Sequence, residues 1–251
     1  MSLRDTVDNA RREFLGNSLA VAGTVTIAPG MLLHMTAQAK PDDQAVTSDV
    51  RWGILIDTSK CARGCSDCVD ACNNEHGLLD STPRSDARQV TQYIRKVTLR
   101  DKETGHEHSL PLMCQHCEHP PCVDVCPTGA SFKRIDGIVL VDKHICIGCR
   151  YCMMACPFKA RSFVHEDVTD QTLASPRGKG TVESCTMCVH KVDRDGTPAC
   201  VEACTDKEHM AMVFGDMKDP ESEISKQLEQ YGGKELREDL GLNQSVRYRG
   251  F

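Results

Sequence analysis

The residues of this chain that can do chemistry are its cysteines, of which there are sixteen among 251 residues. They occur in four groups of four, and no cysteine stands outside a group. Thiolates spaced in this way can bind metal or pair as disulfides, so the spacing must decide between the two. The groups are Cys61, Cys65, Cys68 and Cys72; Cys114, Cys117, Cys122 and Cys126; Cys146, Cys149, Cys152 and Cys156; and Cys185, Cys188, Cys200 and Cys204.

The third group has the Cys-x2-Cys-x2-Cys-x3-Cys-Pro spacing of bacterial ferredoxins. Three thiolates two residues apart on a looping backbone can bind three irons of a cubane, and the fourth cysteine binds the neighbouring cluster. Pro157 follows Cys156, and Pro127 follows Cys126 in the same way. Proline there fixes the chain direction and removes an amide donor. The pattern predicts [4Fe-4S] clusters.

Zinc and disulfides are the two competing interpretations of the cysteines. Structural zinc sites use separated Cys-x2-Cys pairs around one tetrahedral metal, and a third and fourth cysteine crowded into the same run do not suit that geometry. Four cysteines within 11 residues leave little room for unstrained disulfide bridges, and bridges do not select the same Cys-Pro ending twice.

The N-terminus has the features of a signal peptide over residues 1–39. Arg11-Arg12 precedes Phe14-Leu15, an apolar stretch runs from Leu19 to Leu33, and Ala37-Gln38-Ala39 fits the cleavage rule. The stretch is weakly helical in character and short for a membrane span. A twin-arginine signal exports folded proteins, so it predicts a periplasmic protein with its cofactor already inserted. An amphipathic N-terminal helix or an uncleaved anchor are the alternatives.

Composition limits the class of protein. The formal net charge is −6 and aromatic residues make up 4%. An acidic balance without a basic, aromatic-interleaved stripe argues against a nucleic-acid binder. No apolar run reaches the roughly 20 residues of a spanning helix. The length allows at most about two domains.

The segments between the cysteines predict an α+β fold of two ferredoxin modules. Asp136-Gly137 lies between β-forming residues 131–135 and 138–141, which indicates a hairpin between the second and third groups. Residues 51–56 and 210–214 are typical of an opening and a closing strand. We expect one pseudo-symmetric module over 50–110 and 180–216, with the second, 111–165, inserted in it.

Polar segments and a C-terminal tail complete the expected organisation. Residues 73–110 and 166–184 are predicted to be excursions over the cluster core. Residues 217–251 are expected to form a helical tail, whose helix starts at Asp219-Pro220 and ends at Gly232-Gly233. This helix either packs on its own domain or docks a partner.

No other motif supplies substrate chemistry. There is no nucleophile motif, dinucleotide fingerprint or Cys-x-x-Cys-His haem site. His116 and His119 are interpreted as loop packing or hydrogen-bond donors, and His106 and His108 as an exposed turn. Adjacent methionines at 153 and 154 are expected to shield a cluster from water.

Over roughly residues 50–225 the chain resembles the four-cluster iron–sulfur (beta) subunits of membrane respiratory oxidoreductases of the dimethyl-sulfoxide, polysulfide and formate types. Within that family it is most similar to the periplasmic ferredoxin subunits of the transmembrane complexes linked to dissimilatory sulfite reductase. The motifs that carry the resemblance are Cys114-Gln115-His116-Cys117-Glu118-His119-Pro120-Pro121-Cys122, Cys146-Ile147-Gly148-Cys149, Cys185-Thr186-Met187-Cys188, Thr197-Pro198-Ala199-Cys200-Val201-Glu202-Ala203-Cys204, and Gly215-Asp216 with Asp219-Pro220.

The resemblance implies cross-ligation of four [4Fe-4S] clusters. Two departures fall on the first implied set: Cys61-x3-Cys65 replaces Cys-x2-Cys, and Thr205 stands where proline is frequent. Either Gly64 absorbs the extra residue in a turn with positive φ, or the site is altered. The implied sets are Cys61, Cys65, Cys68 and Cys204; Cys185, Cys188, Cys200 and Cys72; Cys114, Cys117, Cys122 and Cys156; and Cys146, Cys149, Cys152 and Cys126.

The resemblance also implies a function and partners. The chain would relay single electrons on the periplasmic side of a respiratory complex, beside an integral-membrane subunit that handles quinone, with a periplasmic multihaem cytochrome c as a further neighbour. One alternative is the beta subunit of a molybdenum enzyme that reduces polysulfide or tetrathionate. An alternative of another class is a zinc- or disulfide-stapled periplasmic binding protein.

Overall fold

The computed structural model describes residues 24–28, 31–34, 45–78, 89–169, 171–172, 175–207 and 209–250. The chain divides into two units, Met1–Asp42 and Asp43–Phe251. In the first unit, β1 (Thr24–Ala28) pairs antiparallel with β2 (Met31–His34), so this part of the apolar stretch is extended rather than weakly helical. Arg11, Arg12 and the cleavage site lie outside the described residues, and the signal peptide stays a prediction.

The larger unit has a three-stranded sheet with β3 (Trp52–Asp57) at its centre. β10 (Met212–Asp216) runs antiparallel to β3, which confirms the predicted opening and closing strands. The middle of β3 is apolar on both faces, and Ile54, Leu55 and Ile56 are almost fully buried. A continuous apolar run of this kind is typical of a strand covered on both sides.

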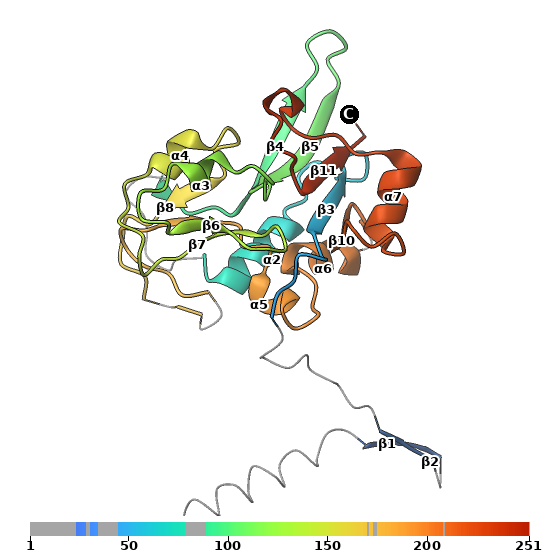
Figure 1. The fold of residues 1–251 in the computed structure, drawn as a ribbon. Helices are drawn as coiled ribbons and strands as arrows, with labels where there is room; N and C mark the ends of the chain where they lie inside the picture. The colour runs from blue at the N-terminus through green and yellow to red at the C-terminus, as the bar shows by residue number, and fades with distance from the viewer. Residues whose placement is uncertain are drawn as a thin grey trace, which may run out of the picture. The chain divides into compact units, whose positions relative to one another are not determined.

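Three helices accompany this sheet. They are α2 (Asp67–His76), α5 (Val189–Val192) and α6 (Ala199–Asp206), and α2 packs directly against α6. Figure 1 shows α2, α5 and α6 together beside the sheet, although α2 is separated from the other two by more than a hundred residues. The fold therefore brings the first cysteine group against the fourth.

The intervening chain builds a second region around short elements. These are α3 (Pro121–Asp124), β6 (Ser131–Lys133), β7 (Val139–Val141), α4 (Tyr151–Ala155) and β8 (Arg161–Phe163), which lie together on one side of Figure 1. β6 and β7 pair antiparallel around Asp136-Gly137, with Gly137 at φ 91°, which confirms the predicted hairpin.

The two expected polar excursions are only partly excursions. β4 (Ile94–Arg100) and β5 (Glu107–Met113) form a hairpin whose tip is exposed but whose base contributes Ile94 and Met113 to the core. β9 (Val182–Ser184) pairs antiparallel with β8 and is buried. Apolar residues in these otherwise polar segments are concentrated where the strands meet the core, which the average polarity of each segment conceals.

The C-terminal segment is not a purely helical tail. Its helix α7 (Glu223–Tyr231) begins after Ser222, whose hydroxyl accepts the amide of Ser225, whereas Asp219 caps only a preceding turn at Glu221. A 3-10 turn, η2 (Glu238–Leu240), follows. The segment then ends in β11 (Val246–Arg249), parallel to β3, because burying Val246 and Tyr248 completes the sheet edge. α7 packs on β10 and β3, as the first of the two interpretations expected.

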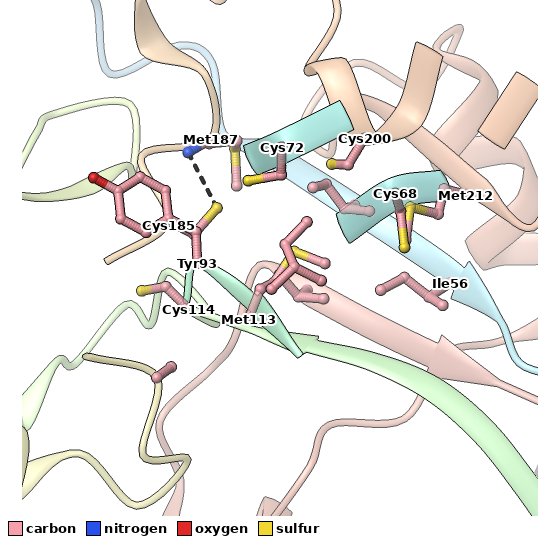
Figure 2. Packing of buried hydrophobic residues seen from close by; sticks show 14 of the residues in the cluster. Ile56, Cys68, Cys72, Tyr93, Met113, Cys114, Cys185, Met187, Cys200 and Met212 are labelled. Carbon is pink, nitrogen blue, oxygen red and sulfur yellow. Dashed lines mark hydrogen bonds between the residues drawn. The ribbon is translucent and has the colours of Figure 1, made fainter. Parts of the chain in front are cut away.

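Much of the core is made of sulfur-containing side chains. Figure 2 shows Met113, Met187 and Met212 among the buried cysteines, with Tyr93 at one side. A polarizable thioether fills irregular space around sulfur and aromatic groups. None of the described helices is long and apolar enough to cross a membrane.

Candidate metal centres

The structure gathers the cysteines into four sets of four thiols, and each set takes three residues from one sequence group and one from another. In two of the sets the four thiols line one cavity. In the other two sets the thiols lie close enough for the charge of one to raise the pKa of another. We name them site A (Cys61, Cys65, Cys68, Cys204), site B (Cys72, Cys185, Cys188, Cys200), site C (Cys114, Cys117, Cys122, Cys156) and site D (Cys126, Cys146, Cys149, Cys152).

Short helices connect neighbouring sites. α2 carries Cys68 of site A and, one turn later, Cys72 of site B, and α6 carries one cysteine of each of the same two sites. α3 and α4 connect sites C and D in a similar way, because Cys126 follows the end of α3 by two residues and Cys156 is the C-cap of α4. Cys114 and Cys185 lie near one another in Figure 2, and the charge of Cys114 raises the pKa of Cys185, so sites C and B are neighbours. The sites follow one another in the order A, B, C, D.

The loops around the sites contain residues with positive φ. Gly64, between Cys61 and Cys65, has φ 76° and accommodates the extra residue of that spacing, as predicted. Met187 and Cys188 adopt φ 53° and 48°, and the amide of Met187 donates to Cys185 Sγ at 3.4 Å. Backbone strain of this kind in non-glycine residues is typical of functional sites.

Burial distinguishes the middle of the series from its ends. All eight thiols of sites B and C are buried. Site A has two partly exposed thiols, Cys61 and Cys65. Site D has two more, Cys126 and Cys146, and Cys149 is exposed. The series is therefore closed to solvent in the middle and accessible at both ends.

Burial also makes these thiols poor anions on their own. It raises the pKa of Cys68 to about 12, that of Cys114 to about 12 and that of Cys188 to about 11. Metal ligation requires thiolates, and a bound cation supplies the positive charge that offsets the burial of four of them. All sixteen cysteines are free of disulfide bonds. Four convergent thiols without nitrogen or oxygen ligands suit iron–sulfur or zinc chemistry.

Hydrogen bonds reach the sulfur atoms from the surrounding chain. Two cationic side chains donate, Lys96 Nζ to Cys61 Sγ at 2.7 Å and Arg161 Nη2 to Cys122 Sγ at 3.1 Å. Backbone amides donate to Cys126 and Cys204 at 3.3 Å each. Such hydrogen bonds are one of the determinants of a cluster's reduction potential.

Sequence reasoning missed these cationic donors. Lys96 is in β4, far along the chain from Cys61, and no motif marks it. The role of His76, whose Nε2 lies 3.4 Å from Cys188 Sγ, was likewise not evident from the sequence. Arg161 follows the third cysteine run by a few residues, and that proximity is the only available signal.

The other predicted residues have more limited roles. His116 is buried and accepts the amide of Val139 on Nδ1 at 3.0 Å, so it is a packed acceptor rather than a donor. His119 is exposed. The rings of His106 and His108 lie 4.6 Å apart on the exposed hairpin. Met153 is partly buried and packs against the cluster that contains Cys122 and Cys152, as expected, whereas Met154 is 65% exposed and does not shield a cluster.

One further group with ligand geometry lies at site A. Asp67 Oδ2 is 3.4 Å from Cys65 Sγ and 3.2 Å from His209 Nε2. Among the described residues this is the one group of three such side chains whose ligand atoms all lie within 4.8 Å of one another, and no three cysteine sulfurs meet that limit. Because Cys65 already belongs to site A, this group forms part of the rim of that site.

Comparison with known proteins identifies the centres. Residues 106–217 and residues 60–130 each match the 4Fe-4S dicluster domain family. The chain is 38% identical to the Hdr-like menaquinol oxidoreductase iron-sulfur subunit 1 of Archaeoglobus fulgidus, over 95% of this chain and 97% of that protein. It is 34% identical to a tetrathionate reductase subunit of Salmonella typhimurium, over 97% and 89%. It is 37% identical to a sulfite dehydrogenase subunit of Allochromatium vinosum, over 78% and 81%.

The fold and its four thiol sites define a ferredoxin-type electron-transfer protein with two 4Fe-4S dicluster domains and four [4Fe-4S] clusters. The chain belongs to the family of iron–sulfur subunits of membrane respiratory oxidoreductases. It transfers electrons through those clusters.

Proposed function

We propose that sites A, B, C and D each hold one [4Fe-4S] cluster, with their four cysteines as ligands, and that electrons pass along the series in that order or its reverse. The observation that carries this proposal is the burial pattern: eight thiols of the middle sites are buried, while both end sites reach the surface. Electrons can enter and leave only where a partner can approach, so the ends are the terminals of the relay.

The clusters would supply one-electron redox chemistry, and the chain would exclude water and stabilise the negative charge on sulfur. One electron enters at one end for each electron that leaves at the other, and no bond of the chain is made or broken. The buried shell of sites B and C excludes water. Amides and cationic side chains stabilise the negative charge on sulfur, by donation to Cys61, Cys122, Cys126 and Cys204 among others.

We propose that the integral-membrane, quinone-interacting subunit docks at site D. Ile145, Ile147, Tyr151 and Met154 are each about half exposed or more, and all four lie within five residues of Cys149 or Cys152. Exposed apolar residues around an accessible redox site are typical of an interaction surface. Site A then serves the second partner, for which a periplasmic multihaem cytochrome is the candidate.

We propose export by the twin-arginine pathway with removal of residues 1–39, so that the mature chain acts in the periplasm. The Arg11-Arg12 pair and the Ala37-Gln38-Ala39 site support this. We also propose that the chain is organised as one ferredoxin module over 50–110 and 180–216, with a second module over 111–165 inserted in it. The pairing of α2 with α6 and of β3 with β10 supports the insertion, because both join chain from before and after it.

The complex we propose is one that exchanges electrons with a quinone pool and serves sulfite-reductase-linked sulfur metabolism. The match over nearly the full length of a protein named as a menaquinol oxidoreductase subunit supports the exchange with quinone, and the match to a sulfite dehydrogenase subunit supports the link to sulfur metabolism. The beta subunit of a tetrathionate-type molybdenum reductase is the second candidate, because 97% of the chain also matches a tetrathionate reductase subunit. A catalytic partner that purifies with bound molybdopterin would favour the second candidate.

The test is the content of iron, acid-labile sulfide and zinc in protein matured anaerobically with its export pathway intact. We expect about sixteen irons and as many sulfides per chain, four for each cluster. About twelve would mean that one site lacks its cluster, and site A, with its unusual spacing, is the one we expect. Zinc in place of iron would overturn the proposal. Cys156→Ala and Cys152→Ala then test the ligand sets: each should perturb one spectroscopically distinct cluster, and the two clusters should differ.

A further inference from the structure

The guanidinium of Arg161 lies between sites C and D. Arg161 is the first residue of β8 and is 5% exposed. Its Nη2 donates to Cys122 Sγ of site C at 3.1 Å and to Ser131 Oγ at 2.8 Å. Cys152 of site D interacts with the same guanidinium. Cys122 and Cys152 belong to the same buried cluster of side chains, so one buried cation donates to site C and lies beside site D.

This guanidinium lacks an ordinary counter-charge. Among the described residues no carboxylate pairs with Arg161, and its Nε and Nη1 have no hydrogen-bond partner there. The other deeply buried arginine, Arg177, shows the usual arrangement, with Glu183 at 3.1 Å. A buried charge without a partner is strongly destabilising, so an anionic group must compensate Arg161.

The sulfur atoms of sites C and D are the candidates for that anionic group within the described part of the chain. Cys122 accepts a hydrogen bond from Arg161, and Cys114 and Cys152 are the next sulfur atoms whose charge acts on the guanidinium. An arginine side chain does not deprotonate in proteins, so its charge is permanent. Thiolates held around an iron–sulfur core carry net negative charge, and that charge increases by one when the core is reduced.

We propose that Arg161 raises the reduction potentials of the clusters at both site C and site D, through its hydrogen bond to Cys122 and its position beside Cys152. A fixed positive charge stabilises the reduced, more negative state more than the oxidised state. Arg161 therefore favours the presence of an electron on the half of the relay that contains sites C and D. The inference rests on the proposed occupation of sites C and D by clusters.

The test is a redox titration of the full chain followed by electron paramagnetic resonance, with iron counted in the same samples. Arg161→Gln removes the charge, and Arg161→Lys retains it. Arg95→Gln is the matched control. Arg95 and Arg161 line one cavity, but Arg95 donates to the carbonyl of Phe158 and to no sulfur. We expect Arg161→Gln to lower two of the four midpoint potentials by at least about 59 mV each. At a fixed potential, this shift decreases the ratio of reduced to oxidised cluster tenfold.

The parent iron count separates the two proposals. If the parent binds far fewer than about sixteen irons, the proposed function fails before the variants are considered. If the parent and Arg161→Gln both bind about sixteen irons and their four midpoint potentials are the same, the role proposed for Arg161 is wrong and the proposed function is unaffected. If Arg161→Gln loses iron, Arg161→Lys should regain both the iron and the two parental potentials. Loss of iron in both variants would overturn the argument from charge.

Discussion

Lys96 provides a test of electrostatic control at the opposite end of the relay. Its ammonium nitrogen lies 2.7 Å from Cys61 Sγ, and it approaches from β4 while Cys61 lies in the loop after β3. Lys96 is partly buried, so solvent weakens this contact less than it would at a fully exposed site. Lys96→Gln removes the positive charge and leaves a side chain of similar length.

The magnitude follows from the hydrogen bond. A hydrogen bond to a charged group contributes about 1.5–3 kcal/mol. Only the part of it that grows when the cluster gains an electron changes the potential. If this part is about half, the substitution removes about 0.75–1.5 kcal/mol from the reduced state, or roughly 30–65 mV for a one-electron couple. The expected result is a decrease of that size in a single midpoint potential, that of site A.

The assay is a potentiometric titration with electron paramagnetic resonance detection, on samples with a measured iron content. Lys96→Arg retains the charge and should keep the parental potential. Lys102→Gln removes a charge from the exposed tip of the same hairpin, where no sulfur is in reach, and should shift nothing. Four unchanged potentials in fully loaded Lys96→Gln would refute the reasoning. So would a shift in the two potentials that respond to Arg161→Gln, since Lys96 and Arg161 contact different sites.

Two further predictions concern the loops and the sheet. Gly148 has φ 68°, and a methyl group on it would meet the carbonyl oxygen of Gly180 at 2.1 Å, so Gly148→Ala should displace the loop of site D and lower the iron count by about four. Gly129 has φ 70° and open space around it, so Gly129→Ala carries the backbone strain alone and should keep its iron. Tyr248→Phe removes a buried hydroxyl that donates to the carbonyl of Pro111 at 3.0 Å and should lower the free energy of unfolding by about 1–3 kcal/mol. Urea denaturation followed by circular dichroism measures it, and an unchanged midpoint would contradict the role given to this hydrogen bond.

The parts of the fold that were predictable are those with local signals. The Asp136-Gly137 turn dictates its hairpin because its two positions favour a tight reversal between β-forming flanks. The apolar run of β3 is long enough to specify a buried strand. β11 has no comparable signal, since only Val246 and Tyr248 alternate with polar residues over four positions. Its parallel pairing with a strand almost two hundred residues earlier depends on the whole chain having folded.

The site was predictable to the extent that cysteine spacing defines it. Spacing identified the groups, but the order of the sites depends on the packing of α2 against α6 and on the approach of Cys114 to Cys185. The cationic donors depend on tertiary structure in the same way. Lys96 reaches Cys61 only because a hairpin folds over the loop, so neither residue predicts the other from the sequence.

The unusual spacing at site A is located where the architecture tolerates it. The extra residue between Cys61 and Cys65 lies in a loop that belongs to site A alone. Cys68 and Cys204 lie instead on α2 and α6, which also carry thiols of site B, and four residues of helix fix about 6 Å between neighbouring thiol positions. An insertion in either helix would displace two sites together, whereas an insertion in the loop changes one. Variation in spacing should therefore accumulate in the outer loops of sites A and D, which are also the surfaces available to partners.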